Sequence, residues 1–306
     1  MKLAMVGLGK MGRGMTERLI QQGHSVVGFD LTPDIVQEVA SKGAIPASSL
    51  EDAVAKLDTS PRIVWVMVPA GDPVGAILEQ LKPPLSPGDI IIDGGNSHYK
   101  DSVQRGLVLG EKGIRFLDTG VSGGVWGLIN GFNLMTGGDK DAYQIVEPIY
   151  KSLAAEGGTM YIGPSGSGHF TKMVHNGIEY GMMQAYAEGF DLIRAKEEYH
   201  IDLAKLSRLW MNGSVVRSWL LELAGNALEE DPNLDSVSPI VVDSGEGRWT
   251  VVEAIDLAVP IPVISLSLQT RFSSRQKDQF GLRLLSALRH QFGGHAVRRE
   301  SDKQQL

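Results

Sequence analysis

Short apolar runs alternate with amphipathic stretches over the first 160 residues of the chain. The runs are rich in β-branched residues, and the stretches between them place apolar residues at helical spacing. The predicted strands are Leu3–Val6, Ser25–Phe29, Ile63–Val68, Ile90–Ile92 and Ile114–Leu117, and the predicted helices include Met11–Gln22 and Pro33–Ser41. Continuous apolar strands separated by helices are typical of a parallel sheet covered on both faces. We therefore expect an α/β fold with a doubly wound parallel sheet.

The alternation of strands and helices ends near residue 164. Before that point, two further strands at Phe132–Thr136 and Thr159–Ile162, with a helix from Asp139 between them, are expected to extend the sheet. Residues 167–300 show long helical patterns and little strand signal. The pattern predicts two domains: a nucleotide-binding domain over 1–164 and an all-α domain over 165–306. The length of 306 residues agrees with two domains of ~150 residues each.

Composition narrows the class of protein. The chain is 42% hydrophobic and 21% charged, which indicates a packed globular protein. Its net charge of −7 argues against a general partner of nucleic acid or of anionic membranes. No apolar run is long enough to span a bilayer, and a glycine turn interrupts any signal-peptide core, so we expect a cytoplasmic protein. The lack of cysteine excludes thiol nucleophiles, disulfides, iron–sulfur clusters and cysteine-based zinc sites.

A glycine-rich turn joins the first predicted strand to the first predicted helix. It reads Gly7-Leu8-Gly9-Lys10-Met11-Gly12. Glycines at this spacing let backbone N–H groups and the helix N-terminus approach a pyrophosphate, which predicts a Rossmann-type dinucleotide site. Asp30 ends the second strand, where a carboxylate binds the adenosine ribose and repels a 2′-phosphate. NAD is therefore favoured over NADP, although Arg13, Lys10 and Thr32 are close enough to help a phosphate. A glycine turn without a ligand is the alternative.

Other turns follow later strands at the carboxyl edge of the predicted sheet, where ligands bind in such folds. The first of these turns reads Val68-Pro69-Ala70. The next reads Asp93-Gly94-Gly95-Asn96-Ser97, for which an ordinary glycine turn with an Asn helix cap is the alternative. The third reads Asp118-Thr119-Gly120-Val121-Ser122-Gly123-Gly124. Its backbone amides and hydroxyl suit a carboxylate ligand, and a flexible turn is the alternative.

One predicted helix carries ionisable and polar side chains on a single face. At ~100° per residue, an arc of about 140° contains Lys172, His175, Asn176, Glu179 and Tyr180. The same face continues through Met183, Tyr186, Ala187 and Phe190, as in a helix packed against protein. Burial lowers the pKa of a lysine and raises that of a glutamate, so Lys172 and Glu179 would form a base and an acid near neutral pH. A Lys172–Glu179 salt link on a solvated face is the alternative.

Together these segments resemble the β-hydroxyacid dehydrogenase superfamily, and within it the 6-phosphogluconate dehydrogenase family in its short bacterial form. The resemblance rests on GLGKMG, on DGGNS, on DTGVSGG and on KMVHNGIEYG at 172–181. Related hydroxyisobutyrate-type enzymes carry Asn at the position of His175 and lack the Glu179-Tyr180 pair. Nearly the whole chain takes part, because Gly247-Arg248-Trp249-Thr250, Arg271 before Ser273-Ser274, and Arg289–His295 (RHQFGGH) are also similar to elements of the family.

The resemblance implies an NAD-dependent oxidative decarboxylation of 6-phospho-D-gluconate, without a metal. Lys172 would be the base and Glu179 the acid. The carboxylate and hydroxyls of the sugar acid would contact Asn96, Ser122, Gly123, Gly124, His175 and Asn176. The phosphate would contact Tyr180, Arg271, Arg289 and His295, of which the last two come from a partner subunit of a homo-oligomer, at least a dimer. The cofactor would contact Gly7, Leu8, Gly9, Lys10, Met11, Gly12, Asp30, Val68, Pro69, Ala70 and Asn96.

The chain departs from the family pattern at Ser244 and Glu246, where the long form has a Lys and a Thr that touch substrate. Those contacts are not transferred, because a glutamate beside a sugar phosphate is unfavourable. Two other functions stay open: a dehydrogenase or reductase for another β-hydroxy acid or imine, and a protein that senses NAD without catalysis. Residues 271–299 contain seven Lys or Arg and one acid, a local charge of +6 that suits a small anion.

Overall fold

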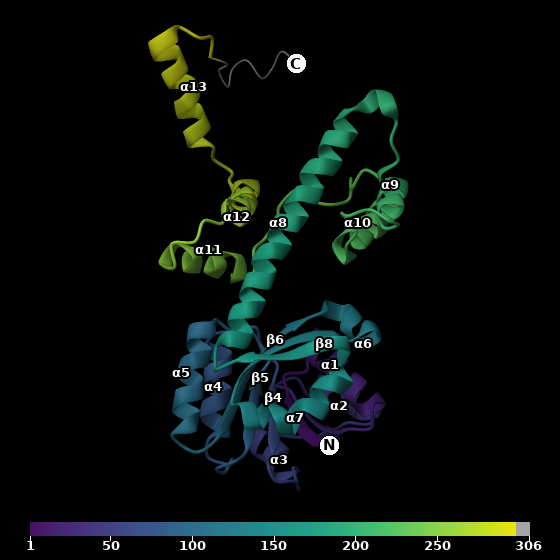
Figure 1. Cartoon of the computed structure of the whole chain (residues 1–306), viewed down its shortest axis with the longest axis vertical. Coiled ribbons are helices and arrows are strands. Elements are labelled where there is room, and N and C mark those ends of the chain that lie inside the picture. The colour runs from purple at the N-terminus through teal and green to yellow at the C-terminus, as the bar shows by residue number, and fades with distance from the viewer. Residues whose placement is uncertain (298–306) are drawn as a thin grey trace. The chain divides into compact units, whose positions relative to one another are not determined.

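The structure, a computed structural model, describes residues 1–297 and divides into two compact units. The first unit combines Met1–Glu179 with Gly245–Pro260, and the second combines Tyr180–Ser244 with the residues from Ile261 onward. An eight-stranded sheet of order β3-β2-β1-β4-β5-β6-β7-β8 forms the centre of the first unit (Figure 1). Its strands are β1 (Lys2–Val6), β2 (Ser25–Phe29), β3 (Ile45–Pro46), β4 (Ile63–Val66), β5 (Ile90–Asp93), β6 (Arg115–Ser122), β7 (Phe132–Gly138) and β8 (Ala154–Gly163).

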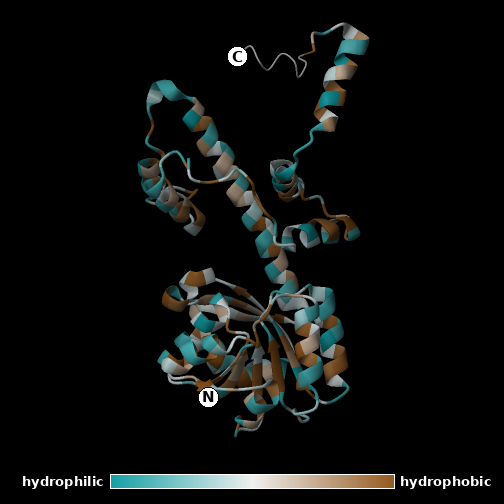
Figure 2. Ribbon diagram, turned by 180° about the vertical axis from the view of Figure 1, so that it is seen from behind, coloured by the Kyte–Doolittle hydropathy of each residue, from teal (hydrophilic) through white to brown (hydrophobic). Residues whose placement is uncertain are grey.

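Helices cover both faces of this sheet. The helices of the first unit are α1 (Lys10–Gln21), α2 (Pro33–Ser41), α3 (Leu50–Ala55), α4 (Asp72–Leu81), α5 (Tyr99–Gly110), α6 (Gly127–Asn130), α7 (Lys140–Leu153), α11 (Glu246–Asp256) and the beginning of α8 (Ser167–Ala195), up to Glu179. Apolar side chains of α1, α2 and α7 share one core cluster with Met5 and Trp65. Those of α3, α4 and α5 share the other cluster with Val6 and Val64. Alternate residues of each central strand thus enter opposite cores, which explains the continuous apolar runs and the hydrophobic strands of Figure 2.

Strands β1 to β6 pair in parallel, as the sequence predicts, but the sheet is not parallel throughout. Strand β7 is antiparallel to β6, because only a 3-10 turn (Gly124–Trp126) and the single-turn α6 connect them, and a parallel pair needs a longer crossover. Strand β6 also extends to Ser122, so the predicted loop from residue 118 is wrong over its first five residues. Strand β4 ends at Val66 rather than Val68.

The second unit is helical over its described residues. It contains the end of α8 (Ser167–Ala195), a 3-10 turn (Glu197–Tyr199), α9 (Leu203–Trp210), α10 (Trp219–Glu230), α12 (Pro262–Arg275) and α13 (Phe280–Gly293). The predicted boundary at 164/165 falls between the end of β8 and the start of α8, whereas the compact units separate within α8. The assignment of domains to 1–164 and 165–306 stays a prediction.

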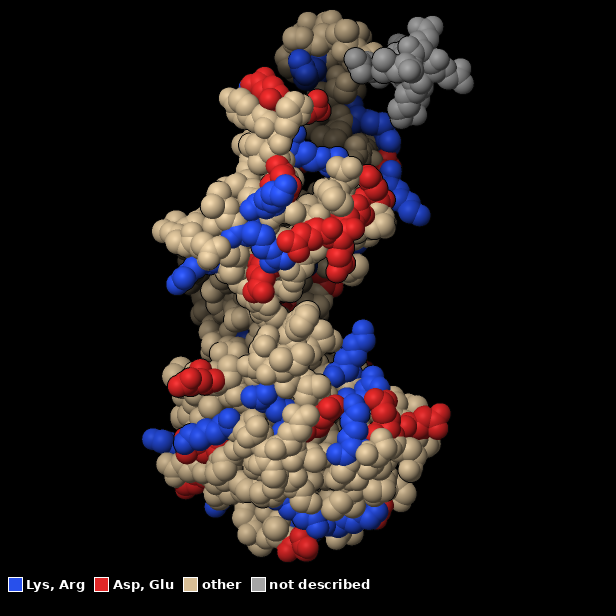
Figure 3. Space-filling model, turned by 90° about the vertical axis from the view of Figure 1, so that its right-hand side faces the viewer, with Lys and Arg blue, Asp and Glu red and all other residues tan. Residues whose placement is uncertain are grey.

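Surface features of the described residues complete the description of the fold. None of these helices is both long and apolar enough to cross a membrane. On the face shown in Figure 3, basic and acidic side chains lie beside one another. Ion pairs join different elements among the described residues, such as Lys42 with Glu17 at 2.7 Å.

Candidate active site

The glycine turn after β1 has the geometry of a phosphate-binding loop. Gly7 has φ +93°, and a Cβ there would lie 2.4 Å from the carbonyl oxygen of Met67. A Cβ on Gly12 would lie 2.0 Å from the carbonyl oxygen of Gly7. A Cβ on Gly9, by contrast, would have no other atom within 4 Å. Gly9 is the N-cap of α1 and provides no side-chain cap, and the first turn has no acidic residue. The turn is therefore closed on the protein side and open where a pyrophosphate would meet the helix N-terminus.

Asp30 connects this turn to the next helix. Its Oδ2 accepts a hydrogen bond from the N–H of Leu8 (2.7 Å), and its Oδ1 accepts one from the N–H of Thr32 (2.9 Å), the N-cap of α2. Val68 borders the same turn, because its Cγ1 lies 2.7 Å from the Cβ position of Gly7. A tight glycine turn, a carboxylate at the end of β2 and an uncapped helix N-terminus fit a nicotinamide dinucleotide.

The turn after β5 is fixed by a buried carboxylate. Asp93 is fully buried and accepts hydrogen bonds from the N–H of Gly95 (3.0 Å), the hydroxyl of Ser97 (2.8 Å) and the guanidinium of Arg105 (3.0 Å). Asn96 then adopts a left-handed φ of +51° and exchanges hydrogen bonds with the backbone of Val121 in β6 (3.0 and 3.3 Å). This side chain brings two of the predicted turns, the one at 93–97 and the one at 118–124, into contact.

Beyond Ser122 the backbone turns through two glycines in left-handed conformations. Gly123 has φ +125° and Gly124 has φ +54°. Nothing lies within 4 Å of the Cβ position of Gly124. Since residues other than glycine rarely adopt a φ like that of Gly123, glycine is favoured there, and the turn is open at Gly124, where the sequence predicts contacts with a carboxylate.

Asp118, within β6, anchors the first turn of α8. Its side chain is fully buried and accepts hydrogen bonds from the N–H groups of Gly166 (2.7 Å) and His169 (2.9 Å). Burial raises the pKa of the Asp118 carboxyl, and the neighbouring His169 and the two N–H bonds oppose that rise. A carboxylate at the start of a helix stabilises the unpaired N–H groups there. Asp118 is thus a support of the helix, which the sequence did not predict because its partners lie 48 and 51 residues away.

Lys172 is packed directly against β6. A Cβ on Gly120 would lie 2.3 Å from the Cβ of Lys172, so only glycine allows this approach. Lys172 is 5% exposed, and its ammonium nitrogen lies 2.6 Å from Oδ1 of Asn176 and 3.3 Å from Nδ1 of His175. His175 in turn lies 3.9 Å from Oε2 of Glu179. The structure therefore brings together four of the five side chains predicted to share one helix face.

Burial sets the ionisation of this cluster. It lowers the pKa of Lys172, while the charges of Glu179 and Glu246 oppose that decrease. Burial and the charge of Lys172 lower the pKa of His175, against the hydrogen bond to Asn176 and the charge of Glu179. The alternative of a solvated Lys172–Glu179 link is wrong, since Lys172 is buried and bonded to Asn176. A buried lysine with a lowered pKa suits a general base.

In the second unit, Tyr180 and Arg271 come together as predicted. Tyr180 is 5% exposed, and the guanidinium carbon of Arg271 lies 3.5 Å from the centre of its ring. The Tyr180 hydroxyl accepts a hydrogen bond from the N–H of Ser244 (3.1 Å). Arg289 lies on α13, and His295 follows the end of that helix. The carbonyl oxygen of His295 accepts a hydrogen bond from the ring of His290 (2.9 Å). Over residues 1–297 no hydrogen bond or ion pair links either of these tail residues to Tyr180 or Arg271.

Comparison with known proteins decides the family. Residues 2–163 match the NAD binding domain of 6-phosphogluconate dehydrogenase. Residues 168–306 match the 6-phosphogluconate dehydrogenase C-terminal domain. The chain belongs to the 6-phosphogluconate dehydrogenase family. The two matches meet within four residues of the predicted domain boundary.

Individual members of the 6-phosphogluconate dehydrogenase family differ in length. An NAD(+)-dependent, decarboxylating 6-phosphogluconate dehydrogenase of Haloferax volcanii is 46% identical over 99% of this chain and 100% of its own. A Bacillus subtilis enzyme of the same description is 38% identical over 90% of this chain, but over only 62% of its own length. A Plasmodium falciparum 6-phosphogluconate dehydrogenase structure is 29% identical and has a TM-score of 0.81, covering 99% of this chain and 68% of that one. The chain thus spans a whole short relative and part of the longer ones.

Sequence reasoning missed the contribution of α11 to this 6-phosphogluconate dehydrogenase site. The Thr250 hydroxyl donates to the carbonyl oxygens of Met173 in α8 (2.9 Å) and of Glu246 (2.8 Å), which joins the two helices. Glu246 begins α11 and is close enough to Lys172 for its charge to raise the lysine pKa. The sequence marks Glu246 only as a departure from the long form. Glu246 comes close to Lys172 through the contact of Thr250 with Met173, and these two residues are 77 positions apart in the sequence.

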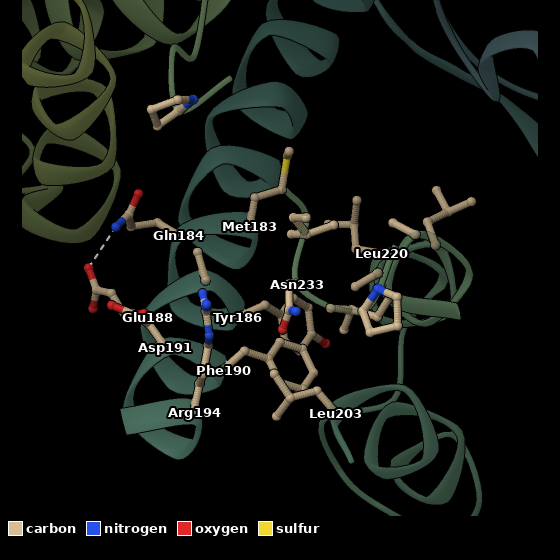
Figure 4. A pocket seen from close by; sticks show the side chains of 18 residues that line it. Met183, Gln184, Tyr186, Glu188, Phe190, Asp191, Arg194, Leu203, Leu220 and Asn233 are labelled. Carbon is tan, nitrogen blue, oxygen red and sulfur yellow. Dashed lines mark hydrogen bonds between the residues drawn. The ribbon is translucent and has the colours of Figure 1, made fainter. Parts of the chain in front are cut away.

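The apolar continuation of the helix face is not a closed core. Met183 is 40% exposed, and Ala187 is also exposed. In the second unit Met183, Tyr186, Ala187 and Phe190 form one wall of a groove of about 770 Å³. The other walls come from Leu203 of α9, from α10 and from the loop that follows α10 (Figure 4). The prediction of a core-facing face therefore holds for Lys172 and Tyr180 and is wrong for Met183 and Ala187, whereas Tyr186 and Phe190 are partly buried.

Across the described residues, no group of three or more His, Asp or Glu side chains is arranged to hold a metal ion. Of the other predicted site residues, Lys10, Met11 and Gly12 lie in the first turn of α1, and Pro69 and Ala70 lie in the turn between β4 and α4.

Proposed function

We propose that the protein oxidatively decarboxylates 6-phospho-D-gluconate to D-ribulose 5-phosphate and CO2, using NAD. One observation carries the chemistry: the buried Lys172 amine, with its lowered pKa, lies on one helix face with Asn176, His175 and Glu179. The substrate class is supported by the two family matches over the chain and by the full-length relative of Haloferax volcanii. A protein that senses NAD without catalysis would not need such an acid and base pair.

The proposed reaction begins at C3 of the sugar acid. Neutral Lys172 takes the proton of the C3 hydroxyl, and the bound nicotinamide supplies the hydride acceptor. The resulting β-keto acid loses CO2, because its ketone accepts the electron pair of the broken C1–C2 bond. The Lys172 ammonium stabilises the enolate oxygen formed at C3. A proton from Glu179 then reaches the carbon that carried the carboxylate, which completes the pentulose phosphate.

The remaining predicted residues are proposed to hold the substrate. The carboxylate and nearby hydroxyls are suited to Asn96, to Ser122 and to the open glycine turn after Ser122. The donors of these residues lie at the carboxyl edge of the sheet. His175 and Asn176 extend that set along α8. Tyr180 and Arg271 supply a hydroxyl and a guanidinium for the phosphate, for which arginine is well suited.

NAD rather than NADP is the proposed cofactor. The Asp30 carboxylate is held at the end of β2 by the N–H groups of Leu8 and Thr32. A carboxylate at that place binds the ribose hydroxyls of NAD and repels the 2′-phosphate of NADP. Asp30 therefore supports the preference that the sequence predicts.

A homo-oligomer, at least a dimer, is also proposed, with Arg289 and His295 completing the site of the partner. None of the residues of α13 is buried within its own chain, and Leu282, Leu285 and Phe292 are each more than half exposed. The apolar groove along α8 is likewise open. An amphipathic helix and an apolar groove that are both uncovered in one chain are typical of surfaces that a second subunit buries.

Arg289→Ala is expected to raise the KM for 6-phosphogluconate about 10- to 100-fold, since a charged hydrogen bond to the phosphate is lost. The matched control is Arg283→Ala on the same helix, where the guanidinium pairs with Asp278. Steady-state kinetics of both variants gives the two KM values for 6-phosphogluconate to be compared. An unchanged KM in Arg289→Ala would favour the dehydrogenase or reductase for another β-hydroxy acid, which needs no phosphate site.

Glu246→Thr, which installs the long-form residue, is expected to move the acidic limb of the kcat/KM profile to lower pH. Lys172 is a base only when neutral, so the rate falls as pH drops through its pKa. The Glu246 carboxylate favours the ammonium form and raises that pKa, and its removal lets burial lower the pKa further. Asp256→Asn, at the exposed end of the same helix, should leave the limb in place. A limb that stays fixed in Glu246→Thr would rule out this electrostatic role.

The function itself is tested with purified protein, NAD and 6-phosphogluconate, by following NADH absorbance and CO2 release together. Both products are expected in equal amounts. NADH without CO2 would contradict decarboxylation, and the absence of both from folded protein would exclude this substrate. Repeating the assay with NADP measures the cofactor preference.

A further inference from the structure

An ion pair joins the two helices that flank Asp30. Nη1 of Arg13, in α1, lies 2.6 Å from Oε2 of Glu38, in α2. The side chains are 34% and 44% exposed, so solvent and ligands can reach both of them. The sequence marked Arg13 as a cation that could help a 2′-phosphate, and the structure shows that a carboxylate already engages it.

The pair lies next to the proposed adenosine ribose site. The N–H of Arg13 donates to the carbonyl of Gly9 (3.0 Å), which places Arg13 in the first turn of α1, directly after the glycine loop. Asp30 joins that loop to the N-cap of α2 through its bonds to Leu8 and Thr32. Because Arg13 pairs with Glu38, its guanidinium lies on the side of α1 that faces α2, the helix that follows Asp30.

We propose that Glu38 is a second determinant of NAD over NADP, acting through Arg13; this rests on the proposed dinucleotide site. Arginine binds phosphate by directing its N–H groups at the oxygens. Glu38 engages Nη1 of Arg13 and offsets the charge of the guanidinium. A 2′-phosphate that binds Arg13 must compete with Glu38 and then faces a nearby carboxylate. NAD has no such group, so its binding does not disturb the pair.

The chain offers a matched control for this pair. Lys42, at the C-cap of α2, lies 2.7 Å from Oε2 of Glu17 in α1. The two pairs therefore join the same helices with similar geometry, but Glu17 lies a full turn further along α1 from the glycine loop. Glu17→Gln removes one negative charge from α1 and leaves Arg13 and Glu38 in place.

Calorimetric titration with NAD and with NADP tests the proposal on the full chain, without any need for turnover. The variants are Glu38→Gln, Arg13→Gln, the double variant and Glu17→Gln, each checked for fold by circular dichroism. Glu38→Gln is expected to shift the affinity ratio toward NADP about 3- to 5-fold, the size of an exposed ion pair. Arg13→Gln should cancel this gain in the double variant. Glu17→Gln should leave the ratio unchanged.

Three results would overturn the role of Glu38: no shift in Glu38→Gln, the same shift without Arg13, or an equal shift in Glu17→Gln. The same shift without Arg13 would mean that Glu38 repels the phosphate by itself. An equal shift in Glu17→Gln would mean that the net charge of the surface sets the preference for NAD over NADP. If the proposed dinucleotide site itself is wrong, the result differs from these three, because folded protein would then bind neither NAD nor NADP.

Discussion

Lys172→Met is expected to lower kcat by about 10³- to 10⁴-fold, because both the base and the enolate-stabilising ammonium are lost. Stability should change little, within about 1 kcal/mol, because a buried amine that is costly to desolvate is replaced by an apolar chain of similar length. Lys172 is 5% exposed and packs against Gly120. Single-turnover rates and a thermal melt of the same variant separate the chemical effect from the structural one.

The control for this substitution is Lys151→Met, which removes an exposed lysine that pairs with Glu147 on α7. Its kcat should match that of the unmodified protein. If Lys172→Met kept a kcat within tenfold of normal, another group would have to be the base. Lys172 would then be a structural lysine.

Gly120→Ala is expected to destabilise the protein by about 3 kcal/mol, the upper range for overpacking a closed contact. The new Cβ would lie 2.3 Å from the Cβ of Lys172 and 3.1 Å from the carbonyl oxygen of Gly168, so α8 must move away from β6. A displacement of about 1 Å at a reacting group can cost about 10²-fold in rate, so kcat should fall as well. Chemical denaturation and steady-state kinetics measure the two effects.

Gly110→Ala provides the comparison, because nothing lies within 4 Å of the Cβ position at the end of α5. That variant should keep full activity, and its free energy of unfolding should be equal or slightly higher, since alanine favours a helix. A Gly120→Ala protein with normal stability and activity would show that α8 and β6 tolerate separation. The close packing of Lys172 against the sheet would then have no catalytic importance.

Both predictions follow from the way in which α8 is held. Asp118 binds the N–H groups at its start, Gly120 allows Lys172 to touch β6, and Thr250 attaches α11 at Met173, the next residue of α8. The lysine is therefore desolvated by the sheet on one side and faces the charges of Glu179 and Glu246. Its basicity is a balance between burial, which favours the neutral amine, and carboxylates, which favour the ammonium ion.

Local patterns were sufficient for much of this architecture. The apolar runs of β1, β2, β4 and β5 give buried strands, since residues that alternate into two cores must all be apolar. The glycine spacing at 7–12 and the helical spacing of Lys172, His175, Asn176 and Glu179 likewise predicted a loop geometry and a shared face. In each case the controlling interactions are between residues close in sequence, so period and spacing carry the information.

Other features depend on contacts between distant residues, and no local pattern contains them. Five features are of this kind. They are the antiparallel pairing of β7, the open groove beyond Tyr180, the role of Asp118 at the start of α8, the pairing of Arg13 with Glu38 and the position of Glu246 near Lys172. The sequence by itself determined which side chains share the face of α8 that is proposed for the acid–base chemistry, and which turns are proposed to bind the ligands. Only the tertiary structure decided what surrounds them, because burial and charge at Lys172 come from β6 and α11, which reach it through folding alone.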